Sequence, residues 1–353
     1  PSGFNFLDGV AAVAANDVWA VGSYSTVSLG SVTLIEQWNG TQWNVVASPN
    51  VAGTTDSLNA VTALSATNVW AVGAYTTASN ATDTLIEHWD GTSWTIIPSP
   101  NASTASAATN ILFQLAGVSA NDLWAVGQYE TSFTGPFLTL AEHLNGTAWS
   151  IVATPNVATQ NSTLSSVAGM ASNDIWAVGD SYPTNSSATA TLIEHWNGAA
   201  WSVVSSPNPS TASSLFWVSA IAANDVVAVG ISTADTLIER WTGSAWSVVP
   251  SPDAGTTRNL LIALTVISPT DLWAVGDDQS GSNPAQTLAL HYPSLARGAP
   301  GGARAPSAAG ARIPCAHPAR GAVPSTGTSA NPRWQLAHYL RARWTRGSGA
   351  MSR

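Results

Sequence analysis

A glutamate followed by a second polar side chain recurs along the chain, and this pair is the combination with the greatest capacity for chemistry. The glutamates are Glu36, Glu87, Glu142, Glu194 and Glu239. The residue after them is histidine in three units, and Gln37 or Arg240 in the other two. A carboxylate beside an imidazole can act as an acid–base pair or bind a metal ion. An active site is asymmetric, however, and a pair repeated in unit after unit favours a structural role.

If the role is structural, each glutamate should be partly buried and must find a hydrogen-bond donor. Strand alternation places Leu34, Glu36 and Trp38 on one face of the same strand. With almost no arginine nearby, the carboxylate is expected to accept from a backbone N–H, an indole N–H, a hydroxyl or the neighbouring unit. The recurring Asn-Asp pairs, such as Asn16-Asp17 and Asn121-Asp122, are expected to close the first hairpin of each unit through Asx bonds.

A second set of candidate residues lies where the repeats differ from one another. They are Tyr24, Tyr75, Tyr129, Glu130, Phe133, Phe137, Asp180, Tyr182, Asp277 and Asp278. Aromatic rings and carboxylates with few cations suit a neutral glycan or a protein partner. Asp180, Asp277 and Asp278 could hold Ca²⁺ through their oxygens, but the chain has no D-x-D-x-D loop. We therefore predict a ligand-binding site without a cofactor.

The elements that position these residues follow from an internal repeat with a period near fifty residues. The motif W-A-V-G begins at Trp19, Trp70, Trp124, Trp176, Val227 (where valine replaces tryptophan) and Trp273. Each unit then carries T-L-I-E-H-W, a turn, and a strand such as W-T-I-I-P. The predicted units span residues 7–50, 58–101, 112–156, 164–208, 215–253 and 261–292.

Four short β-strands are predicted in each unit, because the segments are rich in β-branched and aromatic residues and show no helical period. The first is the V-x-A segment, such as Val61-Ala63. Asn-Gly or Asp-Gly joins the third and fourth strands in most units, and these dipeptides accept the positive φ of tight hairpins. Repeated four-stranded units are typical of the blades of a β-propeller. The predicted fold is an all-β propeller of about six blades.

The pattern W-A-V-G, E-H-W-D-G-T-S-W and I-I-P-S-P-N resembles a kelch repeat over residues 7–292. This resemblance implies a propeller whose aromatic residues pack between blades. The chain has one glycine where kelch repeats usually have two, and tryptophan where they often have tyrosine. Fourteen of the seventeen tryptophans occupy three repeated positions. A structural role between blades is predicted for them, since stacking on a sugar would require exposure.

Composition excludes several functional classes. Residues 1–292 hold all twenty acidic residues against two arginines, a formal charge of −18, so neither nucleic acid nor an anionic membrane is a suitable partner. The only cysteine is Cys315, which excludes a propeller copper site with a cysteine ligand. Two arginines are too few for a sialidase-like cluster. The richness in Ser, Thr, Asn and Gly without lysine predicts a secreted or cell-surface protein, expected to be a monomer.

The sixth unit is incomplete, because the sequence after Tyr292 lacks a fourth strand. Residues 293–353 are rich in Ala, Gly, Pro and Arg, and they are expected to be disordered or translated out of frame. The connections between second and third strands, and those between units, vary in length and fall on one face of a propeller, here named the variable-loop face. Binding residues favour such loops. The predicted function is a binding module; the alternatives are a glycosidase or lyase using acidic residues on that face, or a structural spacer.

Overall fold

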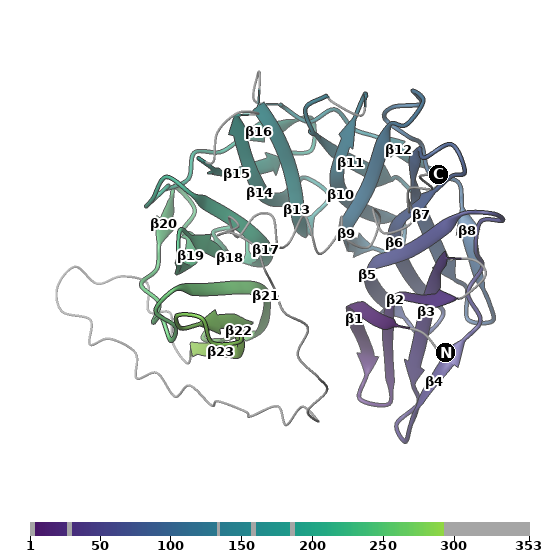
Figure 1. The fold of residues 1–353 in the computed structure, drawn as a ribbon, viewed down its shortest axis with the longest axis horizontal. Helices are drawn as coiled ribbons and strands as arrows, with labels where there is room; N and C mark the ends of the chain where they lie inside the picture. Colours follow the sequence, from purple (N-terminus) through teal and green to yellow (C-terminus); the bar gives the residue numbers. More distant parts are fainter. Residues whose placement is uncertain (1–3, 27–29, 133–134, 157–159, 184–187, 293–353) are drawn as a thin grey trace, which may run out of the picture. The chain divides into compact units, whose positions relative to one another are not determined.

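The computed structural model describes residues 4–26, 30–132, 135–156, 160–183 and 188–292. These residues form twenty-three β-strands, and no helix occurs among them. The strands group into six successive antiparallel units, which we call blades 1 to 6 (Figure 1). A single parallel pairing of Thr82 with Thr109 joins blades 2 and 3 into one sheet. The tail at residues 293–353, for which disorder was predicted, lies outside the described residues.

The strand bounds of the first three blades are as follows. Blade 1 comprises β1 (Asn5–Ala14), β2 (Asp17–Thr26), β3 (Gly30–Trp38) and β4 (Trp43–Val46). Blade 2 comprises β5 (Thr55–Ser65), β6 (Asn68–Thr76), β7 (Thr82–Trp89) and β8 (Trp94–Ile97). Blade 3 comprises β9 (Thr109–Ser119), β10 (Asp122–Glu130), β11 (Leu138–Leu144) and β12 (Trp149–Ile151).

The last three blades repeat this pattern, except that blade 6 has three described strands. Blade 4 comprises β13 (Gln160–Ala171), β14 (Asp174–Pro183), β15 (Ala190–Trp196) and β16 (Trp201–Val203). Blade 5 comprises β17 (Ser213–Ala222), β18 (Asp225–Ser232), β19 (Asp235–Trp241) and β20 (Trp246–Val248). Blade 6 comprises β21 (Arg258–Ser268), β22 (Asp271–Gln279) and β23 (Gln286–Tyr292).

The order of strands within each blade follows the chain, as the repeat pattern predicts. The first strand was predicted to be a short V-x-A segment, and this prediction is wrong, since β1, β5, β9, β13, β17 and β21 have ten to twelve residues each. A β-bulge interrupts each pairing of first and second strands, for example between Leu58 and Ala60. Bulges disturb the alternation of side chains, so the full length of these strands is hard to see in the sequence.

The glycine of W-A-V-G is required by the close approach of the bulged first strand. A Cβ atom added at Gly127 would lie 1.8 Å from the carbonyl oxygen of Ile111, and the equivalent distance at Gly73 is 2.0 Å. Neither partner is the end of a flexible side chain, so the backbone itself would have to move. Every blade shows this contact, which explains why the glycine recurs in all six units.

We predict that Gly127→Ala destabilises the protein by about 2–4 kcal/mol, because an overpacked site must separate two paired strands. Chemical denaturation monitored by tryptophan fluorescence would measure this loss. Ser79→Ala, an exposed position in a loop, serves as the control and should leave the midpoint unchanged. Equal stability of the Gly127→Ala variant and the wild type would contradict the close approach of β9 and β10.

The hairpins between third and fourth strands confirm the turn prediction. Their glycines have positive φ angles of 92° to 98°: Gly40, Gly91, Gly146, Gly198 and Gly243. The residue before glycine fixes the loop further. Asp90 Oδ1 accepts hydrogen bonds from the backbone N–H groups of Thr92 and Ser93, at 2.8 and 2.9 Å, and Asn39 and Asn197 make the same Asx bonds.

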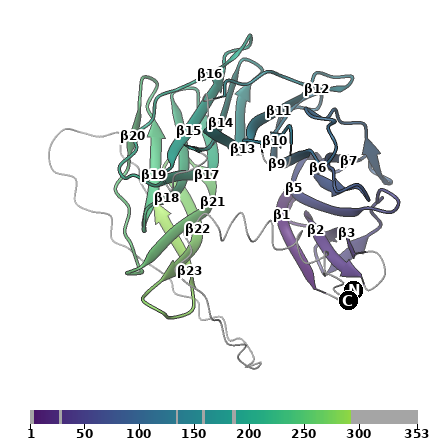
Figure 2. The same ribbon diagram turned by 45° about the horizontal axis from the view of Figure 1, so that its top comes forward.

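Apolar packing joins each blade to the next one along the chain. Five core clusters exist among the described residues, and each combines side chains from two consecutive blades. In one of them Trp124 of blade 3 packs against Trp196 and Trp201 of blade 4, with ring centroids 5.0 and 5.2 Å apart. The ribbon views agree that consecutive blades are neighbours (Figures 1 and 2). The prediction that the repeated tryptophans join blades is confirmed for these contacts.

Candidate functional site

The repeated glutamates are more deeply buried than the sequence predicts. Glu87, Glu142, Glu194 and Glu239 are fully buried, whereas Glu36 of blade 1 is half-buried. Burial raises the pKa of each of the four buried carboxyls to about 8. A carboxyl with such a pKa is mostly protonated at neutral pH, which suits a core position.

Hydrogen bonding divides these glutamates into two pairs. Glu87 accepts a hydrogen bond from the hydroxyl of Ser48 at 2.9 Å, and Glu142 accepts one from Ser99 at 2.7 Å. Both donors come from the segment that leaves the preceding blade, so the predicted hydroxyl or neighbouring-unit donor is confirmed there. Among the described residues, Glu194 and Glu239 have no hydrogen-bond partner for either carboxyl oxygen. For these two residues the expectation of a satisfied carboxylate is wrong.

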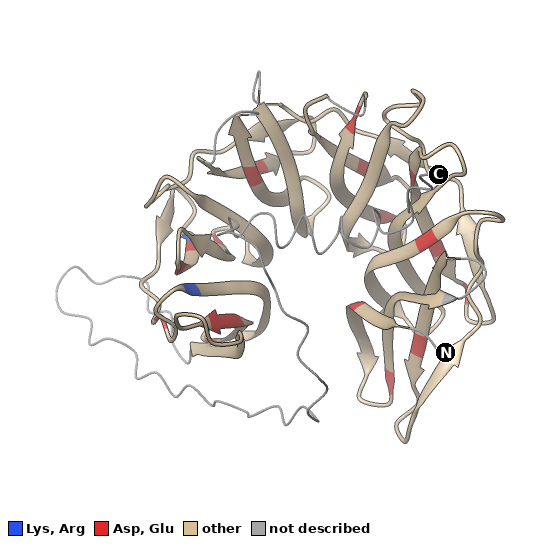
Figure 3. Ribbon diagram, viewed as in Figure 1, with Lys and Arg blue, Asp and Glu red and all other residues tan. Residues whose placement is uncertain are grey.

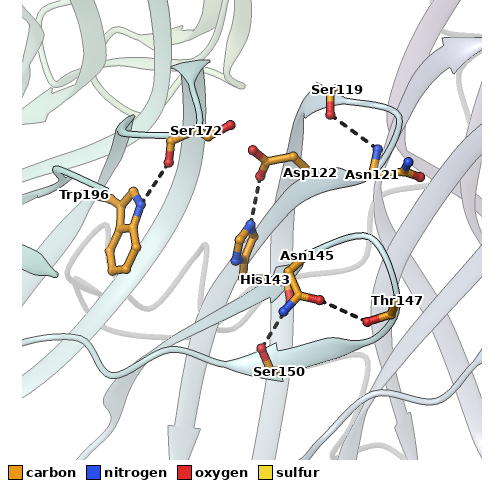
Figure 4. A network of polar contacts seen from close by, with 9 residues as sticks. All are labelled: Ser119, Asn121, Asp122, His143, Asn145, Thr147, Ser150, Ser172 and Trp196. Carbon is orange, nitrogen blue, oxygen red and sulfur yellow. Dashed lines mark hydrogen bonds and ion pairs between the residues drawn. The ribbon is translucent and has the colours of Figure 1, made fainter. Parts of the chain in front are cut away.

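The residue after each glutamate pairs with the acid or amide that begins the second strand. His143 Nε2 lies 2.8 Å from Asp122 Oδ1 (Figure 4), and His195 and Asp174 form the same contact. The imidazole of His143 also stacks on Trp124, with ring centroids 4.1 Å apart. The expected role of Asn-Asp as an Asx turn is therefore incorrect for the aspartate, because its side chain crosses to the third strand. In blade 5 the pair is Arg240 and Asp225, a buried ion pair.

A second repeated network was missed by the sequence analysis. The backbone N–H of Thr84, on the third strand of blade 2, donates to Asn101 Oδ1 at 3.0 Å, and the Thr84 hydroxyl lies 2.7 Å from that of Ser99. The same backbone bond to an asparagine recurs at Thr33, Thr139 and Thr191, and at Thr236 the acceptor is Asp253 Oδ1. The S-P-N motif, or its variants T-P-N in blade 3 and S-P-D in blade 5, thus fastens the segment leaving each of blades 1 to 5 back onto that blade. A constant distance of seventeen residues between threonine and asparagine is the signal that could have revealed it.

Eight of the ten predicted ligand-binding residues lie toward the ends of the second strands. Tyr24, Tyr75 and Tyr129 each stand two residues after the W-A-V-G glycine, and Asp278 holds this position in blade 6. All three tyrosines are half-buried, and Tyr75 and Tyr129 pack against the inter-blade core clusters. In the described part of the chain, acidic residues are distributed over the blades, whereas the two arginines, Arg240 and Arg258, lie in blades 5 and 6 (Figure 3).

In blade 2 the structure brings Tyr75 together with two aspartates on neighbouring strands. Tyr75 is in register with Asp56 on β5 and with Asp83 on β7. Burial raises the pKa of Tyr75, and the charge of Asp83 and its hydrogen bond to the tyrosine raise it further. Burial also raises the pKa values of Asp56 and Asp83. Of these three residues the sequence analysis singled out only Tyr75.

The acidic candidates of blades 3 and 6 have different partners. Glu130 is buried and accepts a hydrogen bond from the Thr109 hydroxyl at 2.7 Å. Asp277 forms an ion pair with Arg258 across β21 and β22. Asp278 is buried and lines a small hollow whose other residues are Ser280, Asn283, Pro284 and Gln286. Asp277 and Asp278 are therefore adjacent in sequence but differ in surroundings.

The remaining candidates are in or beside blades 3 and 4. Asp180 and Tyr182 lie on β14, where both are half-buried, and Tyr182 is in register with Asn161. The backbone N–H of Phe137 donates to Asn161 Oδ1 at 2.8 Å, so this loop of blade 3 is fastened to blade 4. Phe133 lies outside the described residues.

Buried asparagines at the start of the first strands are a further set that the sequence analysis missed. Asn110 donates to the carbonyl oxygens of Thr82 and Ser103 and accepts from the Ser103 N–H. Asn259 makes the equivalent bonds to Ala234 and Gly255. Each therefore links the loop entering its blade to the third-strand region of the preceding blade. An Asn or Asp two residues before the first-strand leucine, as at Asn110 and Leu112, was the available signal.

No group of three or more His, Cys, Asp or Glu side chains that could hold a metal ion occurs in the described part of the chain. The same residues contain no helix that could cross a membrane. The repeated His–Asp pairs thus stand as isolated pairs, and their stacking on tryptophan serves the packing of each blade.

Comparison with known proteins gives a fold but no sequence family. No family model matches the chain, and no curated protein matches it. An α-L-arabinanase from Penicillium chrysogenum, solved with arabinobiose, is 13% identical with a TM-score of 0.53 over 80% of this chain and 93% of its own. A GH74 xyloglucanase from Xanthomonas campestris is 16% identical with a TM-score of 0.53, over 81% of this chain and 45% of its own. The protein YCF48 bound to a D1 peptide is 13% identical with a TM-score of 0.50, over 83% of this chain and 79% of its own.

These structures and the succession of sheets define the class of the protein. The chain is an all-β repeat protein of the β-propeller fold, with about six blades. Identities of 13–16% show the fold alone, and fold alone does not define a function.

Proposed function

We propose that the protein is a non-catalytic, secreted or cell-surface binding module with kelch-like repeats, which recognises a neutral glycan or a protein at its variable-loop face. The observation that carries the proposal is the contrast between the two kinds of polar residue. The glutamates, His–Asp pairs and S-P-N motifs repeat from blade to blade and serve packing. Apart from a tyrosine shared by blades 1 to 3, the residues at the ends of the second strands differ from blade to blade.

The chemistry of this face suits hydroxyl-rich or peptide ligands. Tyr75 with Asp83, and Asp277 with Arg258, each combine hydrogen-bonding groups with apolar surface on a rigid sheet. Such convergent polar groups on an apolar scaffold orient small ligands. The arabinanase and YCF48, which hold arabinobiose and a D1 peptide, support the proposal in that the same fold accommodates both ligand classes.

We expect one glycan or peptide class to bind with saturation in an array followed by calorimetry. The double variant Tyr24→Ala/Tyr129→Ala should weaken that binding about tenfold or more, since an aromatic anchor contributes about 1–2 kcal/mol. Thr147→Ala, in an exposed hairpin between β11 and β12, is the control and should bind as the wild type does.

Two results would count against this proposal. Equal binding by the double variant and the wild type would place the ligand elsewhere on the molecule. Turnover of a bound glycan that is abolished by Asp277→Asn would show the alternative function, a glycosidase or lyase using acids of the same face.

A further inference from the structure

The two ends of the series of blades expose apolar residues, most of which are buried at every equivalent position. On blade 6, Trp273 is 37% exposed and Val275 is 44% exposed, whereas Trp124 and Val126 at the same positions of blade 3 are fully buried. Ile267 lies on the same end of the chain and is also exposed. We name Ile267, Trp273 and Val275 the blade 6 end face.

Blade 1 exposes the opposite half of the same contact. Leu7 is 50% exposed, Val10 is 68% exposed and Trp43 is 46% exposed. Their equivalents in blade 2, namely Leu58, Val61 and Trp94, are buried in the core cluster that joins blades 1 and 2. We name Leu7, Val10 and Trp43 the blade 1 end face.

The two end faces are the two halves of an interface that the chain already forms between consecutive blades. Trp19 of blade 1 packs against Trp89 and Trp94 of blade 2, with ring centroids 5.0 and 5.4 Å apart. Trp273 holds the position of Trp19, and Trp38 and Trp43 hold those of Trp89 and Trp94. Within the described part of the chain, the ring of Trp273 stacks only on His291 of its own blade, with ring centroids 4.3 Å apart.

The receiving pair of tryptophans is already arranged for this contact. The rings of Trp38 and Trp43 are 5.9 Å apart with an interplanar angle of 52°. In the occupied interface, Trp89 and Trp94 are 6.1 Å apart at 43°. Blade 1 therefore presents the same aromatic pair without the tryptophan that packs against it elsewhere, and preorganisation reduces the cost of binding.

We propose that the blade 6 end face of one copy of this chain docks on the blade 1 end face of a second copy, so that copies associate head to tail. The expectation of a monomer, drawn from the sequence, is replaced by this proposal. A second copy fits because every copy carries both halves of the contact, and the five core clusters include none that combines blade 1 with blade 6. Residues 293–353 contain no W-A-V-G motif and no W-x-V-V strand that could serve instead.

The contact is heterologous, since two different surfaces meet, and this property allows a sharp test. Val275→Asp blocks the blade 6 end face and Val10→Asp blocks the blade 1 end face. Both positions are exposed, so neither change should prevent folding, which circular dichroism would verify. Val203→Asp, at an exposed valine on β16 of blade 4, is the matched control.

Sedimentation velocity of the full chain over a hundredfold range of concentration gives the readout. We expect dimers and larger species for the wild type and for Val203→Asp, and monomers for Val275→Asp and Val10→Asp alone. A mixture of these two variants should form a dimer and nothing larger, because each retains one complementary face. A wild type that stays monomeric would overturn the proposal, whether blade 6 closes onto blade 1 of the same copy or the end faces stay open. A mixture of the two variants that stays monomeric would also overturn it.

Discussion

Replacing Trp124 with alanine is expected to destabilise the protein by about 3–5 kcal/mol, the cost of removing a large buried aromatic side chain. Trp124 is fully buried between His143 of its own blade and two tryptophans of blade 4. The cavity would lie at the interface of two blades, where the surrounding rings are held by their own strands and can collapse only in part. Chemical denaturation followed by circular dichroism would measure the loss.

Trp273 provides a matched control for this experiment, because it has the same place in the repeat and the same stacked histidine. It is 37% exposed, so Trp273→Ala should cost less than half as much when measured at a concentration where the chain is monomeric. Equal losses at the two positions would contradict the view that stability resides in the contacts between blades rather than within each blade.

The sequence predicts the strands because their residues repeat, and it fails where geometry departs from alternation. Five copies of W-A-V-G and one of V-A-V-G located the second strands correctly. The Asn-Gly and Asp-Gly dipeptides located hairpins whose glycines have positive φ. The first strands were underestimated because a bulge beside residues such as Leu58 shifts the pattern of side chains. The sequence also did not show why the W-A-V-G motif needs glycine, because the carbonyl oxygen that a Cβ atom there would meet belongs to the first strand.

The polar residues show a second limit of prediction from one sequence. Repetition correctly indicated that Glu87 and Glu142 serve structure, but it did not reveal that Ser99 bonds Glu142 across a blade boundary. Asn110 escaped notice because a single asparagine before a strand resembles an ordinary turn residue, and its partners lie on the preceding blade. Contacts between blades depend on how sheets pack, and spacing within one unit does not encode them.

The stability of the protein is expected to fall as the pH rises from about 5 to about 8. Burial raises the pKa of Glu194 and of Glu239 from 4.5 in the unfolded chain to about 8 in the folded protein. Between these pH values the folded protein holds protons that the unfolded chain has released, so each rise in pH favours unfolding. Above about pH 8 both states are ionised and the effect levels off. One pKa unit corresponds to about 1.4 kcal/mol, so a rise from 4.5 to about 8 sets an upper limit on the order of 5 kcal/mol for the loss contributed by each residue.

The double variant Glu194→Gln/Glu239→Gln separates this effect from other titrations, because glutamine has the same shape and no charge. We expect it to match the wild type in free energy of unfolding near pH 5 and to exceed it near pH 9. Part of the pH dependence should persist, since Glu87 and Glu142 also have raised pKa values and keep their hydroxyl donors. Ser79→Ala, at an exposed position in a loop, is the control and should leave the dependence unchanged. If the double variant lost stability with pH as steeply as the wild type, Glu194 and Glu239 would be ionised in the folded protein, and water or movement of the neighbouring blade would have to supply the donors that both carboxyl groups lack.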